Sequence, residues 1–142
     1  MAHVSLVTLG VDDLDAATAF YEALGWTRSP ASVEGTVAFL TGGAVVLGLF
    51  GREALADEAG VEFGGARTTG AMALAMNLPS PEAVDDVLAT AADAGARITR
   101  PAVAADWGGY SGYLTDLDGH LWEIAHNPGF PLAADGTVTL PG

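Results

Sequence analysis

The pattern of apolar and polar positions in the first half of the chain predicts one helix among three strands. Apolar and β-branched residues cluster where the strands are expected, and apolar residues recur at spacings of three and four where the helix is expected. Gly25 predicts the end of the helix, and Gly42-Gly43 predicts a tight hairpin between the last two strands. The predicted elements are a strand at 4–11, a helix at 14–24, and strands at 37–40 and 44–50.

The second half repeats this order. Ser80 followed by Pro81 is typical of the N-cap and first position of a helix. Gly95 predicts the end of that helix, and Asp118-Gly119 predicts a turn before the last strand. The predicted elements are a strand at 72–78, a helix from 81, and strands at 97–103, 112–116 and 120–126. The chain therefore contains a weak internal repeat, each half being β-α-β-β-β or close to it.

Two units of this kind predict an α+β fold in which two paired βαβββ modules form curled mixed sheets around a cavity. Each helix would lie behind its own sheet, and the two concave faces would look into the shared cavity. The 142 residues are expected to form a single domain, since this length is usual for one. The expected parts are module one at about 4–50, a linker at 51–70 with a short helix in EALADEAG, module two at about 71–127, and a C-terminal tail at 128–142 along the surface.

The excess of acidic over basic residues indicates which classes of partner the protein can bind. Eighteen acidic residues face five basic residues, which gives a formal net charge of −13. Such a chain repels nucleic-acid phosphates and attracts cationic ligands, although a charge of this size also serves solubility alone. The chain has no Cys, which excludes disulfides and cysteine nucleophiles. There is no basic signal-peptide region and no long apolar run, so we expect a cytoplasmic protein with no nucleic-acid or membrane partner.

The stretch HLWEIAH, residues 120–126, carries three side chains that bind metals elsewhere. His120, Glu123 and His126 are evenly spaced, and two imidazoles with a carboxylate suit a catalytic zinc or iron site. The preceding turn and the following Pro128 favour a strand, in which side chains alternate between two faces. Glu123 then lies on one face and the two His on the other, so the three cannot share one ion.

The stretch WGGYSGY, residues 107–113, is rich in aromatic residues. Trp107, Tyr110 and Tyr113 lie within seven residues, among three Gly that allow close backbone approach. Aromatic side chains with polar atoms suit the wall of a ligand cavity, but they also fill core space, and the sequence leaves both interpretations open. Ser111 is not in a strand-turn-helix context, so it does not fit a nucleophile elbow.

These motifs together resemble a known family. The pattern V-x-D-L-x-x-x-x-x-F-Y-x-x-L-G-W at 11–26, the second helix ending in A-G-A, and WGGYSGY-LTDLDGHLWEIAHNP at 107–128 are similar to the vicinal oxygen chelate superfamily. This superfamily includes glyoxalase I, bleomycin-resistance proteins and extradiol dioxygenases, and the resemblance covers residues 4–130. It implies paired βαβββ modules, which agrees with the internal repeat, and it implies a homodimer.

The resemblance also implies where a metal would be bound. Metal enzymes of the superfamily carry one ligand on the first and last strand of each module. In this chain the matching positions hold Leu6, Gly48, Ala73 and Glu123, of which only Glu123 has a ligating side chain. A single carboxylate does not hold a divalent ion well, so we expect no metal and no cofactor.

Three hypotheses about function follow. The first is a metal-free protein that binds a small molecule, such as a cationic drug or natural product. The second is an enzyme of the superfamily, a lyase, isomerase or dioxygenase, with Glu123 as its catalytic residue, either a general base or a metal ligand. The third is a structural module whose cavity is filled by its own side chains. The residues expected to bind the small molecule are Leu6, Phe39, Met72, Met76, Trp107, Tyr110 and Tyr113.

Overall fold

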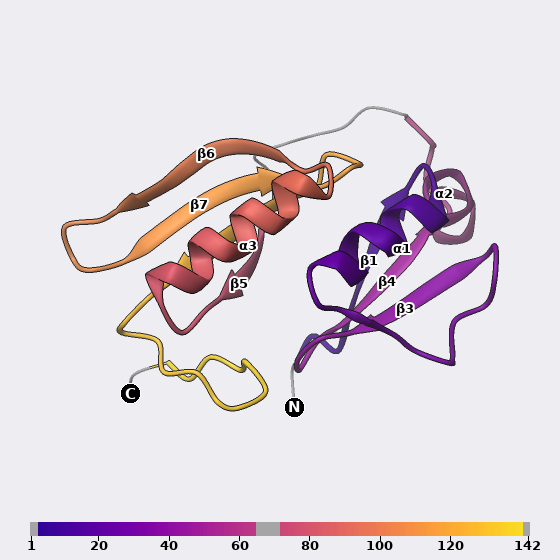
Figure 1. Cartoon of the computed structure of the whole chain (residues 1–142). Coiled ribbons are helices and arrows are strands. Elements are labelled where there is room, and N and C mark those ends of the chain that lie inside the picture. Colours follow the sequence, from indigo (N-terminus) through magenta and orange to yellow (C-terminus); the bar gives the residue numbers. More distant parts are fainter. Residues whose placement is uncertain (1–2, 65–71, 141–142) are drawn as a thin grey trace. The chain divides into compact units, whose positions relative to one another are not determined.

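The structure, a computed structural model, describes residues 3–64 and 72–140. The chain divides into two compact units, Met1–Arg67 and Thr68–Gly142, and each is considered by itself (Figure 1). Each unit contains one four-stranded mixed sheet with helices, and neither sheet is closed. The predicted α+β fold with two βαβββ modules is confirmed.

The first unit contains a sheet with the strand order β1-β4-β3-β2, in which β1 and β4 are parallel and the other pairs antiparallel. The elements are β1 (Leu6–Val11), α1 (Leu14–Ala23), β2 (Thr27–Arg28), β3 (Val37–Thr41), β4 (Val46–Gly51) and α2 (Arg52–Ala59). The short helix predicted in EALADEAG is present as α2. The predicted hairpin between β3 and β4 is present, but residues 42–45 form a longer loop than a tight turn.

The second unit repeats the topology with the strand order β5-β8-β7-β6, in which β5 and β8 are parallel. The elements are β5 (Leu74–Asn77), α3 (Pro81–Asp93), β6 (Arg97–Ala104), β7 (Tyr110–Thr115) and β8 (Leu121–His126). Ser80 caps α3 as predicted, since its hydroxyl accepts a hydrogen bond from the Ala83 amide at 3.1 Å. Asp13 caps α1 in the same way, through the Ala16 amide at 2.9 Å.

Each sheet is covered on one face by a helix, α1 on the first sheet and α3 on the second (Figure 1). Alternate strand residues are buried beneath that helix, as the strand period of two requires. The buried apolar strand residues on the helix-covered faces are Leu9, Val11, Ala38, Leu40, Leu47 and Leu49 on the first sheet, and Leu114, Trp122 and Ile124 on the second. Ala125 is also buried, but it lies on the opposite face of the second sheet. The residues between them point to the opposite face, which we call the open face of that sheet. No helix in the described ranges is both long and apolar enough to cross a membrane.

Candidate ligand-binding site

One row of side chains crosses the open face of the second sheet. Arg100 of β6 pairs in register with Tyr113 of β7, Tyr113 pairs with Glu123 of β8, and Glu123 pairs with Ala75 of β5. Side chains in register on neighbouring strands lie on the same face, about 5 Å apart. The row therefore places a cation, a phenol ring, a carboxylate and a methyl group next to one another.

Tyr113 and Glu123 are joined by a hydrogen bond, in which the Tyr113 hydroxyl donates to Oε2 of Glu123. This bond is the main reason that the pKa of Tyr113 is raised above its ordinary value of 10.0, and burial and the charge of Glu123 act in the same direction. The nearby guanidinium of Arg100 acts the opposite way. The hydrogen bond fixes one oxygen of the carboxylate, while Oε1 accepts no hydrogen bond from the described residues.

Arg100 reaches the open face because β6 is irregular. Ile98 pairs with the buried Leu114, whereas Arg100, two residues later, pairs with Tyr113, the adjacent residue on β7. Two residues of β6 thus oppose one residue of β7, which is the geometry of a β-bulge. Without the extra residue, Thr99, strict alternation would place Arg100 on the same face as Ile98, beneath α3.

The guanidinium of Arg100 is held at three points. Its Nη2 donates to the backbone oxygen of Ser111 at 2.9 Å and to the Ser111 hydroxyl at 2.8 Å. Its Cζ atom lies 5.0 Å from the centre of the Tyr113 ring, within the range of a cation–π contact. The Nε atom is buried and has no hydrogen-bond partner among the described residues. Leaving such a donor unpaired costs about 1–3 kcal/mol, so it is the unsatisfied group of the row.

The two His of HLWEIAH are not part of this row. Trp122 and Ile124 are buried beneath α3, so Glu123 points to the open face between them. The Nδ1 atom of His126 lies 3.0 Å from the backbone oxygen of Leu78. His120 lies in the turn before β8, where its amide donates to the Asp116 carboxylate at 2.8 Å. The structure confirms that strand alternation separates Glu123 from His126.

The open face of the first sheet is apolar around Gly48. A Cβ atom built on Gly48 would lie 3.3 Å from the Thr8 hydroxyl, 3.7 Å from Leu6 and 3.7 Å from the Phe39 ring. Leu6 and Phe39, two of the residues predicted to bind ligand, are thus brought together by the fold. Gly48 itself is buried between these side chains, which cover the open face at this point.

The side chains at the four family metal positions do not fit a metal ion. In the first unit, Leu6 and Gly48 supply no ligating side chain. In the second unit, Glu123 faces Ala75, which supplies no second ligand, and one oxygen of its carboxylate accepts a hydrogen bond from Tyr113. Ala73 lies before the start of β5 and also lacks a ligating group. Within the described ranges, no three His, Asp or Glu side chains are grouped closely enough to hold an ion.

Four other residues predicted to bind ligand lie away from the row. Trp107 is 68% exposed in the connection between β6 and β7, and Met72 is 64% exposed before β5. Tyr110 points toward α3, since its hydroxyl donates to Asp85 at 2.7 Å. Met76 pairs in register with the buried Ile124, which places it on the α3 side as well. These four residues do not form one cluster, so a cavity filled by them is not seen within this unit.

Neither Arg100 nor the structural part played by Ser111 was predicted from the sequence. The signal for Arg100 was Pro101, because proline inside a strand is confined to edges and bulges. β6 is an edge strand, and the register shifts occur on both sides of Arg100. The bulge could have been suspected from this proline, but its position, and hence the face of Arg100, could not be derived from the pattern.

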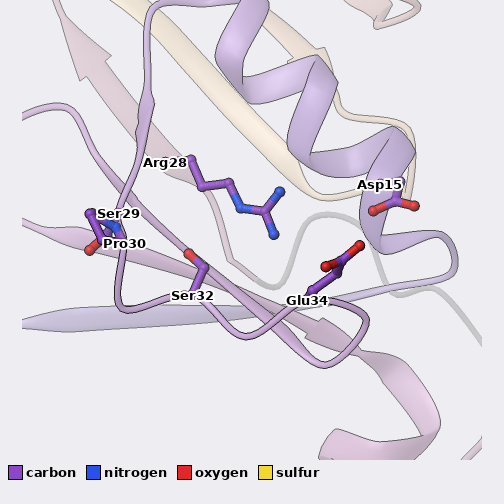
Figure 2. Close-up of a pocket in the computed structure, with 6 residues that line it drawn as sticks. All are labelled: Asp15, Arg28, Ser29, Pro30, Ser32 and Glu34. Carbon is purple, nitrogen blue, oxygen red and sulfur yellow. The ribbon is translucent and has the colours of Figure 1, made fainter.

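The first unit also has a polar depression of about 560 Å³ at one end of α1. It is lined by Asp15, Arg28, Ser29, Pro30, Ser32 and Glu34. Figure 2 shows the side chain of Arg28 extending toward the space between the carboxylates of Asp15 and Glu34. Apart from Pro30, these lining residues are polar or charged, and none is aromatic. The row on the second sheet combines an aromatic ring with a carboxylate and a guanidinium, so we treat it as the candidate site.

Comparisons with known proteins agree with this fold. A model of the glyoxalase/bleomycin resistance protein/dioxygenase superfamily matches residues 1–124. A glyoxalase-related enzyme from Fulvimarina pelagi is similar over 100% of both chains, with 36% identity and a TM-score of 0.88. No curated protein matches the chain.

Two further solved structures share the fold at lower identity. A glyoxalase/bleomycin resistance protein/dioxygenase family enzyme from Burkholderia phytofirmans PsJN is 21% identical, with a TM-score of 0.79, over 88% of this chain and 98% of that chain. Lactoylglutathione lyase from Agrobacterium tumefaciens is 21% identical, with a TM-score of 0.66, over 89% of this chain and 95% of that chain.

Proposed function

The chain belongs to the glyoxalase/bleomycin resistance protein/dioxygenase superfamily, and within it we propose that the protein binds a small molecule without a metal ion. The observation that carries the proposal is the hydrogen bonding of the Glu123 carboxylate. This carboxylate stands at the one family metal position with a ligating side chain, and there it accepts a hydrogen bond from Tyr113. A metal ligand needs partner ligands, and the residues at the other three positions are Leu6, Gly48 and Ala73.

The charge of the site favours a cationic ligand group. Glu123 keeps Oε1 without a hydrogen bond from the described residues, and a carboxylate oxygen accepts strong hydrogen bonds from ammonium or guanidinium donors. The net charge of −13 would raise the local concentration of cations around the protein. The ring of Tyr113, next to Glu123, adds a surface on which an aromatic or aliphatic part of the ligand can pack.

A binding titration tests this proposal. Cationic aromatic and peptide-like compounds, with neutral and anionic analogues as controls, would be titrated against the intrinsic fluorescence of Trp107 and the other tryptophans, with and without a chelator. We expect at least one cationic compound to bind with a Kd below about 100 μM, equivalent to about −5.5 kcal/mol, and equally well with chelator present. Failure of every cationic compound to reach this affinity would overturn the proposal.

A measurement of bound metal separates this proposal from a metal enzyme. Protein purified without chelator should contain much less than one transition-metal ion per chain. A stoichiometric ion would show that the comparison of Leu6, Gly48 and Ala73 with the family ligand positions is wrong. Glu123 would then be a metal ligand, as the enzymatic hypothesis holds.

The free oxygen of Glu123 also favours a second candidate, a metal-free enzyme in which this carboxylate acts as a general base. A base must reach the proton that it removes, and Oε1 is the atom available for this. If a substrate that the protein turns over is found, Glu123→Gln should abolish turnover while the Tyr113 hydroxyl can still donate to the amide oxygen. Full turnover by Glu123→Gln would exclude Glu123 as the general base.

The homodimer and the cytoplasmic location are parts of the same proposal. The homodimer rests on the family resemblance and the location on the sequence. Light scattering after size-exclusion chromatography should give the mass of two 14.3 kDa chains. Fractionation of the native host, followed by detection of the protein, tests the location.

A further inference from the structure

We propose that Arg100 binds an anionic oxygen group of the small molecule, so that the ligand carries both a cationic and an anionic group. This inference rests on the proposed function, because it concerns the same open face of the second sheet. It adds a residue that neither the family pattern nor the motifs of the sequence indicate. The ligand class is then an amino-acid-like or peptide-like compound rather than a simple amine.

Arg100 has no ionic partner among the described residues. Eighteen acidic side chains are present in the chain, yet Arg100 forms no ion pair with any of them in the described ranges. Its contacts are with neutral groups, namely Ser111 and the ring of Tyr113. A half-buried guanidinium without a counter-charge suits the recognition of a carboxylate or phosphate from outside.

Arg100 is also held in one orientation before any ligand arrives. Two hydrogen bonds from Nη2 and the contact with Tyr113 restrict the long side chain. A side chain that is already ordered loses little conformational entropy on binding, which favours affinity. Because Nη2 is used and Nε is buried, Nη1 is the nitrogen left to meet a ligand oxygen.

The two opposite charges of the row, on Arg100 and Glu123, are separated from each other. Arg100 and Glu123 are both in register with Tyr113 but on opposite sides of it, so one strand lies between them. They therefore form no ion pair with each other. A ligand that lies along the row across the Tyr113 ring would present an anionic group to Arg100 and a cationic group to Glu123.

Matched probes test this inference by calorimetric titration. Three compounds share one aromatic group: 2-phenylethylamine carries a cation, 3-phenylpropanoate carries an anion, and phenylalanine carries both. Tryptamine, indole-3-propanoate and tryptophan form a second series. We expect the amino acid of at least one series to bind the wild-type protein at least tenfold more tightly than its amine. Equal or weaker binding of the amino acid in both series overturns the inference.

Variants then assign the preference to Arg100. Arg100→Gln should abolish the tenfold preference for the amino acid over its amine, because the group that meets the anion is gone while the charge at Glu123 is kept. Arg28→Gln is the matched control, since it removes the same charge from an exposed position in the other unit and should keep the preference. A preference retained in Arg100→Gln overturns the inference. If this variant does not fold, Arg100→Lys replaces it, and the preference should fall because the planar fork is lost.

The outcomes for the two proposals are distinguishable. If the amines bind but the amino acids gain nothing, the inference fails and the proposed cationic site stands. If none of the six probes binds, the inference is overturned, and the proposed function is decided by the wider titration of cationic peptide-like compounds.

Discussion

Tyr113 and Glu123 face each other in register on adjacent strands, and the hydroxyl of Tyr113 donates a hydrogen bond to Oε2 of the carboxylate. Glu123 stands where the family resemblance predicts a metal ligand, and here it accepts a hydrogen bond from its neighbour on β7. The hydrogen bond engages Oε2 of the carboxylate and leaves Oε1 without a hydrogen bond from the described residues. Because this hydrogen bond raises the pKa of Tyr113, its contribution can be measured in solution.

We expect this hydrogen bond to stabilise the folded protein fully at neutral pH and to lose its effect in alkali. The pKa of Tyr113 is raised above 10.0 in the folded protein. Below that value the phenol is protonated in both the folded and unfolded states, so its contribution is fully present. Above it the unfolded state loses the proton first, and the free energy of unfolding falls as the pH rises through the folded pKa. Denaturant unfolding from about pH 8 to about pH 11.5 measures this loss.

Replacing Tyr113 by Phe should flatten the alkaline part of that curve, because the group that titrates is gone. Tyr110 supplies a control, since its pKa is also raised, mainly by its hydrogen bond to Asp85 on the surface. Tyr110→Phe should therefore leave the contribution of Tyr113 in place. An identical alkaline slope for the wild-type protein and Tyr113→Phe would contradict the assignment.

A double-mutant cycle should give a coupling free energy of about 1 kcal/mol between Tyr113 and Glu123, because the bond is partly buried and one partner is charged. The variants are Tyr113→Phe, Glu123→Ala and their combination, each unfolded at neutral pH. The same cycle with Tyr110→Phe and Asp85→Ala is the comparison, since that bond is exposed. Its coupling should be smaller. Coupling of equal size at the two pairs would show that the Tyr113–Glu123 bond gains nothing from its position.

The fold was predictable because the signals that define it are local and occur twice. The capping residues Asp13 and Ser80 start the two long helices, and strand alternation fixes which residues are buried. Strand β2, which consists of the two exposed residues Thr27 and Arg28, was not predicted. A strand this short carries no pattern, and only its pairing with β3 defines it.

The site was predictable only in part, because the face of a strand residue depends on register. Glu123 and Tyr113 were named from the sequence, and the fold brings them into contact. Tyr110 was named with Tyr113, although the two are three positions apart in a strand and therefore lie on opposite faces. Arg100 was missed because a bulge changes the alternation along β6. A bulge is defined by how two strands pair. The apolar and polar pattern of one strand does not show that pairing.

Replacing the N-cap residue of α1 or of α3 should lower the stability of the protein, because each module uses a side-chain cap to start its helix. Ser80→Ala and Asp13→Ala each delete a side-chain acceptor for an amide of the first helical turn. Each substitution should lower the free energy of unfolding by about 1 kcal/mol. Ser80→Asp should restore most of the loss, since Asp is a good N-cap residue and its charge suits the start of a helix. A loss of similar size in Ser80→Asp would show that the hydroxyl of Ser80 acts in another way.

Gly112 allows α3 to pack closely against the second sheet, and Gly112→Ala should destabilise the protein. A Cβ atom at this position would lie 2.8 Å from Leu88 of α3, and 3.1 Å and 3.2 Å from backbone atoms of Ala102 and Arg100. The Leu88 side chain can move, but the two backbone atoms belong to β6 and cannot move independently. Overpacking of this kind costs about 1–3 kcal/mol, so a drop of this size in the free energy of unfolding is expected.

A shift of β6 is the second expected consequence of Gly112→Ala, because the new methyl group would press on the backbone that holds Arg100. Amide hydrogen exchange in β6 should therefore be faster in this variant than in the wild-type protein. Gly64→Ala is the control, since a Cβ atom there meets nothing within 4 Å and the backbone of Gly64 does not require glycine. It should leave both stability and exchange unchanged. Wild-type stability in Gly112→Ala would show that α3 and β6 can move apart without cost, contrary to the close packing described for this unit.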